Sequence, residues 1–253
     1  MIWYKAWLET RWRFFIGLAI LSCSAIGVVL TRPEVVKLMP LANSMEVSGE
    51  IGRRIQEAVA LSREYRGYVW VQWFSQNLAQ MGTFFAVLLG TGGLLSQSSA
   101  ALFTLSLPIT RNRLLGIRAA VGLGEWLVLV FASSLLIPLL SGSVGETYGL
   151  GNTAIHGACA FVAGAAFFSL ALLLSTMFDD IWRPLLVALL VAIVLALIPQ
   201  IVRDLAPYSI FRVMSAENYF RSGRLPWLGL LAVAAASAAM LYRAAINLTH
   251  RDF

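Results

Sequence analysis

SQSSAALFTLSLPITRNRLLGIR, residues 96–118, lies between two long apolar stretches and ends in three clustered arginines, Arg111, Arg113 and Arg118. Apolar runs of about 20 residues are long enough to cross a bilayer as helices. Irregular backbone is excluded from lipid, so a segment that joins two such runs is expected outside the hydrocarbon. The pattern predicts a membrane protein in which residues 96–118 form a surface outside the membrane that another molecule can bind.

The composition of the 253 residues supports this class. Charged residues make up 13% and hydrophobic residues 59%, whereas a soluble domain carries about 25% charged residues. The net charge of +6 favours contact with anionic lipid headgroups, and no basic run interleaved with aromatic residues points to nucleic acid. Cys23 and Cys159 lie in apolar runs, and no Cys/His cluster has the spacing of metal ligands, so neither a disulfide nor a metal site is expected.

The apolar runs predict an all-α integral membrane protein with one transmembrane domain, residues 1–253. Six transmembrane helices are expected, at about 14–30, 69–95, 114–140, 154–178, 184–202 and 226–245. Residues 2–13 separate tryptophans from charges, which is typical of a short interfacial helix, and the alternative is that they begin the first span. An amphipathic extracytoplasmic helix, acting as a prop or as a lid, is expected at about 44–66, where Asn43 and Glu46 resemble a capping box.

Six spans place both termini on one side of the membrane. The total number of Lys and Arg residues does not determine which side of the membrane is cytoplasmic, because nine fall on the side of the termini and ten on the other. Arg11 and Arg13, however, face only Arg32 across the first span, and the first helix usually dominates orientation. The loop 141–153 has no Lys or Arg, as expected outside. We therefore expect a multi-pass protein of the inner (cytoplasmic) membrane with both termini in the cytoplasm.

Polar side chains inside the expected spans are the candidates for a translocation path. In the second span they are Gln72, Gln76, Asn77 and Gln80. Their spacing predicts one stripe, which either lines a path or makes interhelical hydrogen bonds. Glu125, deep in the third span, is either a further path residue or the partner of Arg118 two turns earlier. His156 is expected to be interfacial and hydrogen-bonded.

The chain has no motif for binding ATP or for catalysis. There is no GxxxxGK[ST] loop, and neither of the two lysines, Lys5 and Lys37, follows a glycine. Residues 142–145, Gly-Ser-Val-Gly, resemble a serine nucleophile site only superficially, because no base is nearby. A stand-alone secondary transporter or channel stays open as an alternative, and so does a membrane-embedded enzyme that uses Glu125 or the pair at 179–180.

Residues 102–111, LFTLSLPITR, resemble the segment after the second helix in permease subunits of ATP-binding-cassette exporters, the type-2 permease family. That family commonly shows Leu-Pro, an aliphatic residue, Ser or Thr, then Arg. The start KAWLETRWRF (5–14), the ending THRDF (249–253) and six spans in 253 residues are also similar. The chain departs from the family at residues 98–100, Ser-Ser-Ala, where an acidic residue and Gly-Thr are common.

The resemblance implies a transport subunit, not an enzyme, that pairs as a homodimer or heterodimer in the lipid bilayer. Two copies of a separate ATPase subunit would bind ATP and Mg, and this chain itself would hold no cofactor. A coupling helix at about 97–107, inside a coupling segment at 96–113, would sit in a groove of the ATPase and transmit its closure. The expected docking residues are Phe103, Leu107, Pro108, Arg111 and Arg113. The two arginines would pair with acidic groups of the ATPase or with lipid phosphates.

Overall fold

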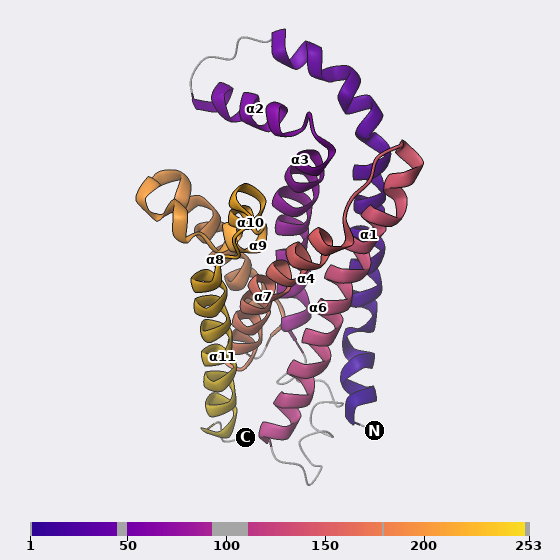
Figure 1. The fold of residues 1–253 in the computed structure, drawn as a ribbon. Helices are drawn as coiled ribbons and strands as arrows, with labels where there is room; N and C mark the ends of the chain where they lie inside the picture. The colour runs from indigo at the N-terminus through magenta and orange to yellow at the C-terminus, as the bar shows by residue number, and fades with distance from the viewer. Residues whose placement is uncertain (1, 45–49, 93–110, 179, 251–253) are drawn as a thin grey trace.

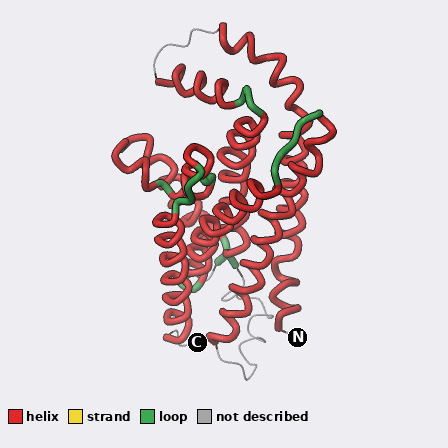
Figure 2. The backbone as a smooth tube through the Cα atoms, in the orientation of Figure 1, coloured by secondary structure: helices red, strands yellow, loops and turns green. Residues whose placement is uncertain are grey.

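In the computed structural model the chain is a bundle of long helices (Figure 1, Figure 2). The structure describes residues 2–44, 50–92, 111–178 and 180–250, and within these ranges it contains helices and loops but no strand. Five of the described helices are long and apolar enough to cross a membrane. The predicted class, an all-helical membrane protein, is confirmed at this level.

Four of these five helices match the expected spans closely. The five are α1 (Ile2–Ser44), α6 (Arg111–Ser141), α7 (Leu150–Ser175), α8 (Trp182–Ile201) and α11 (Trp227–His250). All but α1 begin and end within five residues of the expected positions. The lengths of the apolar runs account for this agreement, because each helix needs about 20 apolar residues to cross the hydrocarbon core.

Helix α1 is longer than expected and includes the segment before the first span. The sequence predicts an interfacial helix over 2–13 and a span over 14–30, but the structure has one unbroken helix of 43 residues. Thr10 is 3% exposed, so this segment packs on the bundle and the separate interfacial helix is not formed. Pro33 and Pro40 lie in the upper part of α1, which curves over toward α2 in Figure 1, as helices do at prolines.

The second expected span, 69–95, is made of three consecutive helical segments. They are α3 (Tyr65–Val69), the π-helical η1 (Trp70–Asn77) and α4 (Leu78–Gly90). The segments follow one another without a break, but each alone is too short to cross a membrane. The run ends at Gly90 because Thr91 is extended and Gly92 has a φ of +100°, which glycine adopts without strain.

The ends of the helices gather at two ends of the bundle. Both chain termini lie at what we call the lower end in Figure 1, where α4 ends and α6 begins. At the opposite, upper end lie α2 (Glu50–Leu61) and the connection between α8 and α11. That connection contains η3 (Arg203–Tyr208), α9 (Ile210–Met214) and α10 (Glu217–Ser222). Helix α2 is shorter than the amphipathic helix expected over 44–66, because a turn follows Leu61.

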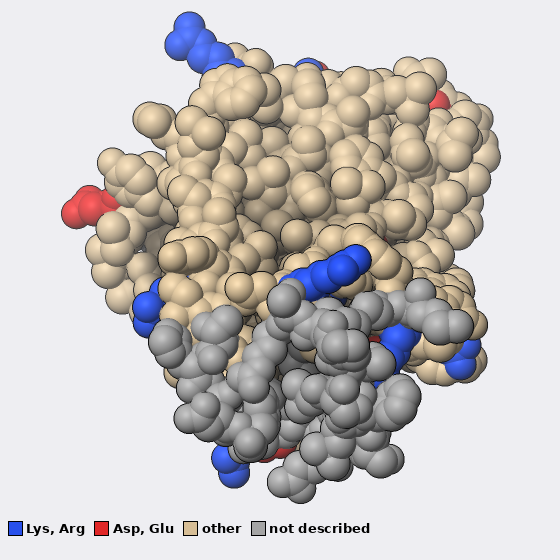
Figure 3. Space-filling model, turned by 90° about the horizontal axis from the view of Figure 1, so that it is seen from below, with Lys and Arg blue, Asp and Glu red and all other residues tan. Residues whose placement is uncertain are grey.

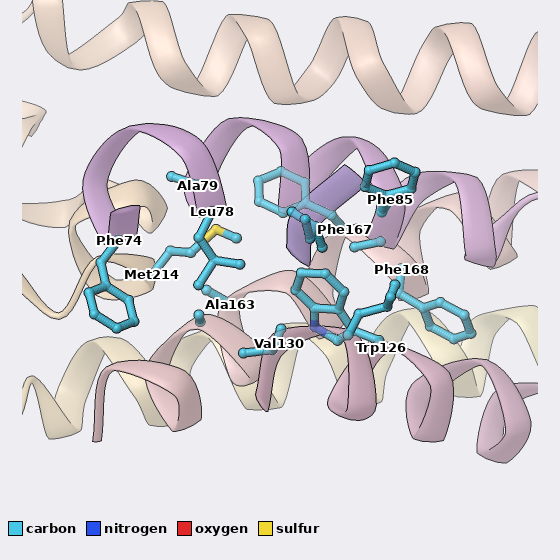
Figure 4. Packing of buried hydrophobic residues seen from close by; sticks show 14 of the residues in the cluster. Phe74, Leu78, Ala79, Phe85, Trp126, Val130, Ala163, Phe167, Phe168 and Met214 are labelled. Carbon is cyan, nitrogen blue, oxygen red and sulfur yellow. The ribbon is translucent and has the colours of Figure 1, made fainter. Parts of the chain in front are cut away.

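Helix α7 is the most buried of the five. In the most apolar 18-residue stretch of α7, 67% of the residues are buried, compared with 11% in the corresponding stretch of α11. Its small residues admit large neighbours: the indole of Trp126 occupies the place of a Cβ on Gly164 and donates to the Phe161 carbonyl oxygen at 3.1 Å. Phe167 and Phe168 of α7 lie close to Trp126 in Figure 4. Membrane helices associate through such close packing, because lipid tails are as apolar as their side chains.

Candidate functional site

The chain leaves α4 at the lower end through a buried junction. Thr91 is 0% exposed, and its carbonyl oxygen accepts hydrogen bonds from Arg13 Nη1 at 2.6 Å and from Arg118 Nη2 at 3.4 Å. Arg13 Nη1 also donates to the Leu88 carbonyl oxygen at 3.0 Å. The last carbonyls of a helix lack partners within it and carry partial negative charge. Two guanidinium groups therefore satisfy the end of α4.

A carboxylate from α1 holds Arg118 in place. Arg118 Nη1 lies 3.3 Å from Glu9 Oε2, and the side chain of Arg118 is 9% exposed while that of Glu9 is 38% exposed. A guanidinium this deeply buried needs an opposite charge, because removing it from water without one is costly. We call Glu9, Arg13, Thr91 and Arg118 the Thr91 network.

Two further hydrogen bonds extend the Thr91 network to neighbouring helices. Thr10 Oγ1 donates to Glu125 Oε1 at 2.6 Å and so joins α1 to α6. The Gly92 amide donates to Ser175 Oγ at 3.2 Å and so joins the end of α4 to α7. A Cβ on Gly92 would lie 3.2 Å from both terminal nitrogens of Arg13, so glycine leaves room for this guanidinium. Helices α1, α4, α6 and α7 thus meet just before residues 93–110.

Glu125 is not the direct ion-pair partner of Arg118, although the two charges lie close enough to interact. Arg118 pairs with Glu9, 109 residues away along the chain, and Glu125 accepts from Thr10. The sequence separation of 118 and 125 fits one face of α6, but α1 packs along α6 and supplies nearer partners. Glu125 is 6% exposed, and its Oε2 has no hydrogen-bond partner within residues 2–44, 50–92, 111–178 and 180–250.

Part of the expected docking surface lies outside the described residues. Phe103, Leu107 and Pro108 fall in the range 93–110, and the side chain of Arg111 is also outside the description. Arg111 begins α6, and Arg113 in the first turn of α6 is exposed. Figure 3 looks at this lower end and shows basic side chains scattered over it. Of the expected docking residues, Arg113 is thus accessible at the end where the Thr91 network lies.

The four amide side chains of the second span, which we call the amide stripe, lie at the surface of this single copy. They are Gln72, Gln76, Asn77 and Gln80. Gln76 and Gln80 are exposed and the other two are half-buried. None of the four makes a hydrogen bond to the part of the chain that the structure describes. An amide without a partner in hydrocarbon is costly, so in a membrane-spanning run the stripe would require water, a bound molecule or a second protein surface.

The π-helical segment η1 carries most of the amide stripe and is anchored on its buried side by aromatic residues. Trp70 Nε1 donates to the Ser215 carbonyl oxygen at 2.9 Å, and Trp73 Nε1 donates to a serine hydroxyl of α6 at 3.1 Å. The Phe74 ring stacks on His156 with centroids 4.6 Å apart. π-Helical turns are rare and recur at functional sites. These anchors fix the inner side of η1, which leaves the amides on its outer side.

His156 is buried between helices near the start of α7. It is 0% exposed, and its Nδ1 lies 3.0 Å from the Ser215 carbonyl oxygen. The expected hydrogen bond is confirmed, and the side chain is buried because α9 packs against α7. The other ring nitrogen, Nε2, and the hydroxyl of Tyr148 are buried and have no hydrogen-bond partner among the described residues. His156 therefore serves as a packing residue between η1 and the connection that contains α9.

Several residues of these sites give no signal in the sequence. Arg32 is 4% exposed at the upper end, where it donates to the carbonyl oxygens of Ser62 at 2.6 Å and Arg63 at 2.8 Å. Arg13 and Thr91 are likewise found only in the structure. Arg13 borders the first apolar run and looks there like a topology signal. The carbonyl groups that Arg13 binds lie 75 and 78 residues away.

Comparison with known proteins adds no assignment: no family model, no curated protein and no solved structure matches the chain. Among the described residues, no group of three or more His, Cys, Asp or Glu side chains could hold a metal ion. The function is therefore argued from the Thr91 network, the amide stripe and the resemblance of residues 102–111.

Proposed function

We propose that this chain is the membrane-spanning permease subunit of an ATP-driven exporter. Two permease copies, identical or related, form a dimer in the inner membrane, and each binds a separate ATPase subunit that carries ATP and Mg. The ATPase docks on residues 96–113 at the lower end, which we place in the cytoplasm together with both termini. In this proposal the run α3–η1–α4 is the remaining span, which brings the total to six.

The Thr91 network is the observation that carries the proposal. A force on residues 96–113 would reach α4 through Thr91, α1 through Arg13, and α6 through Arg118. Hydrogen bonds to charged groups contribute roughly 1.5–3 kcal/mol each, so the junction resists being pulled apart. A short segment tied to several spans can convert closure of an ATPase into a shift between inward-open and outward-open states.

The amide stripe supports a path for the substrate on the outer side of η1 and α4. From Gly67 to Gly90 the run contains no charged residue, so the stripe offers hydrogen bonds without fixed charge. A second permease copy facing this surface would enclose Gln76 and Gln80 in a polar passage. Glu125 is buried among α1 and α6 and is left out of this path.

Co-purification with a candidate ATP-binding-cassette ATPase from the same genome tests the proposal. We expect a stable complex in nanodiscs whose rate of ATP hydrolysis differs from that of the ATPase alone. Changing both Arg111→Glu and Arg113→Glu should weaken the complex at least about tenfold, which is about 1.4 kcal/mol, because the new charges repel acidic groups of the ATPase. The measurement is a titration of labelled ATPase onto the permease.

Two other basic residues at the lower end provide the matched control. Arg183, whose side chain is 72% exposed, and Arg243, also exposed, lie on α8 and α11 and are not part of the segment 96–113. The pair Arg183→Glu and Arg243→Glu makes the same change in charge and should leave the affinity unchanged. If both pairs of substitutions weakened binding equally, the ATPase would be attracted to the basic face in general. If the chain formed no complex with any candidate ATPase, the proposal would be overturned.

Cysteine labelling tests the amide stripe without knowledge of the substrate. After Cys23 and Cys159 are replaced, Gln76→Cys and Gln80→Cys should react with a membrane-impermeant maleimide at least about tenfold faster than Leu190→Cys, because a thiol in lipid stays protonated and unreactive. Leu190 is a suitable control, since it is 59% exposed on α8 beside the α4–α8 groove that Gln80 lines. Equal labelling rates at all three positions would show that the stripe does not line a water-filled path. Disulfide bonds between two copies, without labelling by the maleimide, would show that the stripe is a dimer contact.

A proton-coupled carrier that works alone is the second candidate, favoured by one observation. The Oε2 atom of Glu125 is buried without a partner inside a span, and ionisable groups there commonly relay protons. Transport in vesicles without any ATPase, abolished by Glu125→Gln, would support this candidate. Transport that requires the ATPase and survives Glu125→Gln would exclude it.

A further inference from the structure

A groove of about 740 Å³ opens at the upper end of the bundle, between the start of α11 and the connection formed by η3, α9 and α10. Its walls are mainly apolar. They include Pro207, Val213, Pro226, Leu228, Ala232 and Val233. Leu228 is 86% exposed, although it lies in a helix that is apolar enough to cross a membrane. With α11 crossing a bilayer, we expect the apolar part of the groove to face hydrocarbon.

The upper part of the groove is polar and positively charged. Arg212 and Asn218 line it, and the connection 203–225 contains four arginines but only two acidic residues. Glu217 is shared by two of these arginines: it accepts from Arg212 Nε and from Arg221 Nε, at 2.5 and 2.8 Å. One carboxylate thus faces two guanidinium groups, which leaves a net positive charge at this rim.

Glu217 also orients Arg212 toward the groove. The two bonds between them use Nε and Nη2 of Arg212, which leaves Nη1 to donate to another group. Burial opposes ionisation of Glu217, but the hydrogen bonds and charges of Arg212 and Arg221 outweigh it and lower the pKa of Glu217. The carboxylate therefore stays charged, and Arg212 is held in one position.

The order of polarity along the groove matches that of a phospholipid. Tyr208 is 83% exposed and Trp227 is 63% exposed, and both line the groove. Exposed tyrosine and tryptophan are typical of the depth of the headgroups. A guanidinium group binds phosphate through planar, paired hydrogen bonds. Arg212 and Asn218 lie on α9 and α10 at the upper end, and α11, which carries Leu228, Ala232 and Val233, runs down from there.

We propose that this groove binds an anionic phospholipid, with the phosphate at Arg212 and Asn218 and an acyl chain along Leu228 and Ala232. The charge of the rim favours an anionic headgroup over a zwitterionic one, because one carboxylate does not neutralise its arginines. The site depends only on the η3–α9–α10 connection and α11, so it stands whether or not the chain is part of an exporter.

The test compares two lipids that differ only in the headgroup. The purified, delipidated chain receives phosphatidylglycerol or phosphatidylcholine with the same acyl chains, and Tm is followed by tryptophan fluorescence while native mass spectrometry counts retained lipid. We expect phosphatidylglycerol to raise Tm and to be retained, with phosphatidylcholine having little effect. Arg212→Gln should weaken the response to phosphatidylglycerol at least about tenfold in lipid concentration. Ala232→Phe should abolish it by filling the trough.

Two controls make the test decisive. Arg243→Gln removes the same charge from the lower end of α11, and Ala236→Phe adds the same ring one turn below Ala232, outside the groove lining. Both should respond to phosphatidylglycerol like the unchanged chain. The proposal would be overturned if Arg212→Gln and Ala232→Phe responded to phosphatidylglycerol like the unchanged chain. It would also be overturned if the unchanged chain responded equally to both lipids. It would also fail if Ala232→Phe changed the monomer–dimer equilibrium without changing lipid retention, because a second copy would then cover the groove.

Discussion

Replacing Arg13 by leucine is expected to lower the free energy of unfolding by about 3–6 kcal/mol, because it removes two hydrogen bonds from a charged group, each contributing roughly 1.5–3 kcal/mol. The carbonyl oxygens of Leu88 and Thr91 would lose their bonds of 3.0 and 2.6 Å. Only Arg118, at 3.4 Å, would still reach Thr91. Unfolding of the purified chain in detergent, followed by tryptophan fluorescence, measures the loss. Where the variant stays folded, ATP hydrolysis by the proposed complex should no longer respond to the permease.

Arg11 provides a matched control on the same helix. It makes no hydrogen bond to the residues that the structure describes, where its Nε is buried without a partner, and its guanidinium lies 5.5 Å from the ring centroid of Trp12. Arg11→Leu should therefore cost no more than a cation–π contact, about 0.5–1 kcal/mol. Arg13→Lys keeps the charge but loses the planar guanidinium that can donate to two carbonyl oxygens at once. Its loss of unfolding free energy should therefore lie between those of Arg11→Leu and Arg13→Leu. Equal losses from Arg11→Leu and Arg13→Leu would show that the Thr91 network does not hold α4.

Replacing Gly90 by leucine is expected to separate α4 from α7. A Cβ at position 90 would lie 2.9 Å from the Cβ of Ala171 and closer still to the Phe168 carbonyl oxygen. Backbone atoms cannot rotate out of the way, so the helices must move apart. Overpacking of this kind costs roughly 1–3 kcal/mol and sometimes more. The measurements are Tm and the fraction of the chain that elutes as a single species in gel filtration.

Gly124 on α6 allows the same chemical change without the steric conflict. Nothing lies within 4 Å of a Cβ at this position, and Gly124 is exposed. Gly124→Leu should leave Tm unchanged or raise it, because leucine favours a helix over glycine by up to about 1 kcal/mol. If Gly90→Leu is as well tolerated as Gly124→Leu, then α4 and α7 do not pack as closely as the structure shows.

The positions of most spans follow from the sequence because they depend on a local property. A bilayer selects apolar runs of sufficient length, so α6, α7, α8 and α11 were predictable within five residues. The first span was not, because polar residues such as Thr10 and Arg13 hide a helix that begins at Ile2. These side chains bind partners on other helices in the folded chain. A hydropathy scale scores them as polar residues in solvent, because it takes no account of such partners. The π-helical segment was also missed, since tertiary anchors such as the hydrogen bond of Trp73 to α6 hold it.

The sequence by itself determined the class of the protein, four of its helices and the amides in its second span. These features depend on composition and on spacings of a few residues. Only the tertiary structure decided which charges meet and which polar groups stay exposed: Arg118 pairs with Glu9 from α1, and Gln76 and Gln80 find no partner in the part of the chain that the structure describes. The physical reason is that the energy of a buried charge or amide depends on groups brought near it by packing, often from helices a hundred residues away. The proposals on coupling, path and lipid binding rest on those long-range contacts and on the surfaces they leave open.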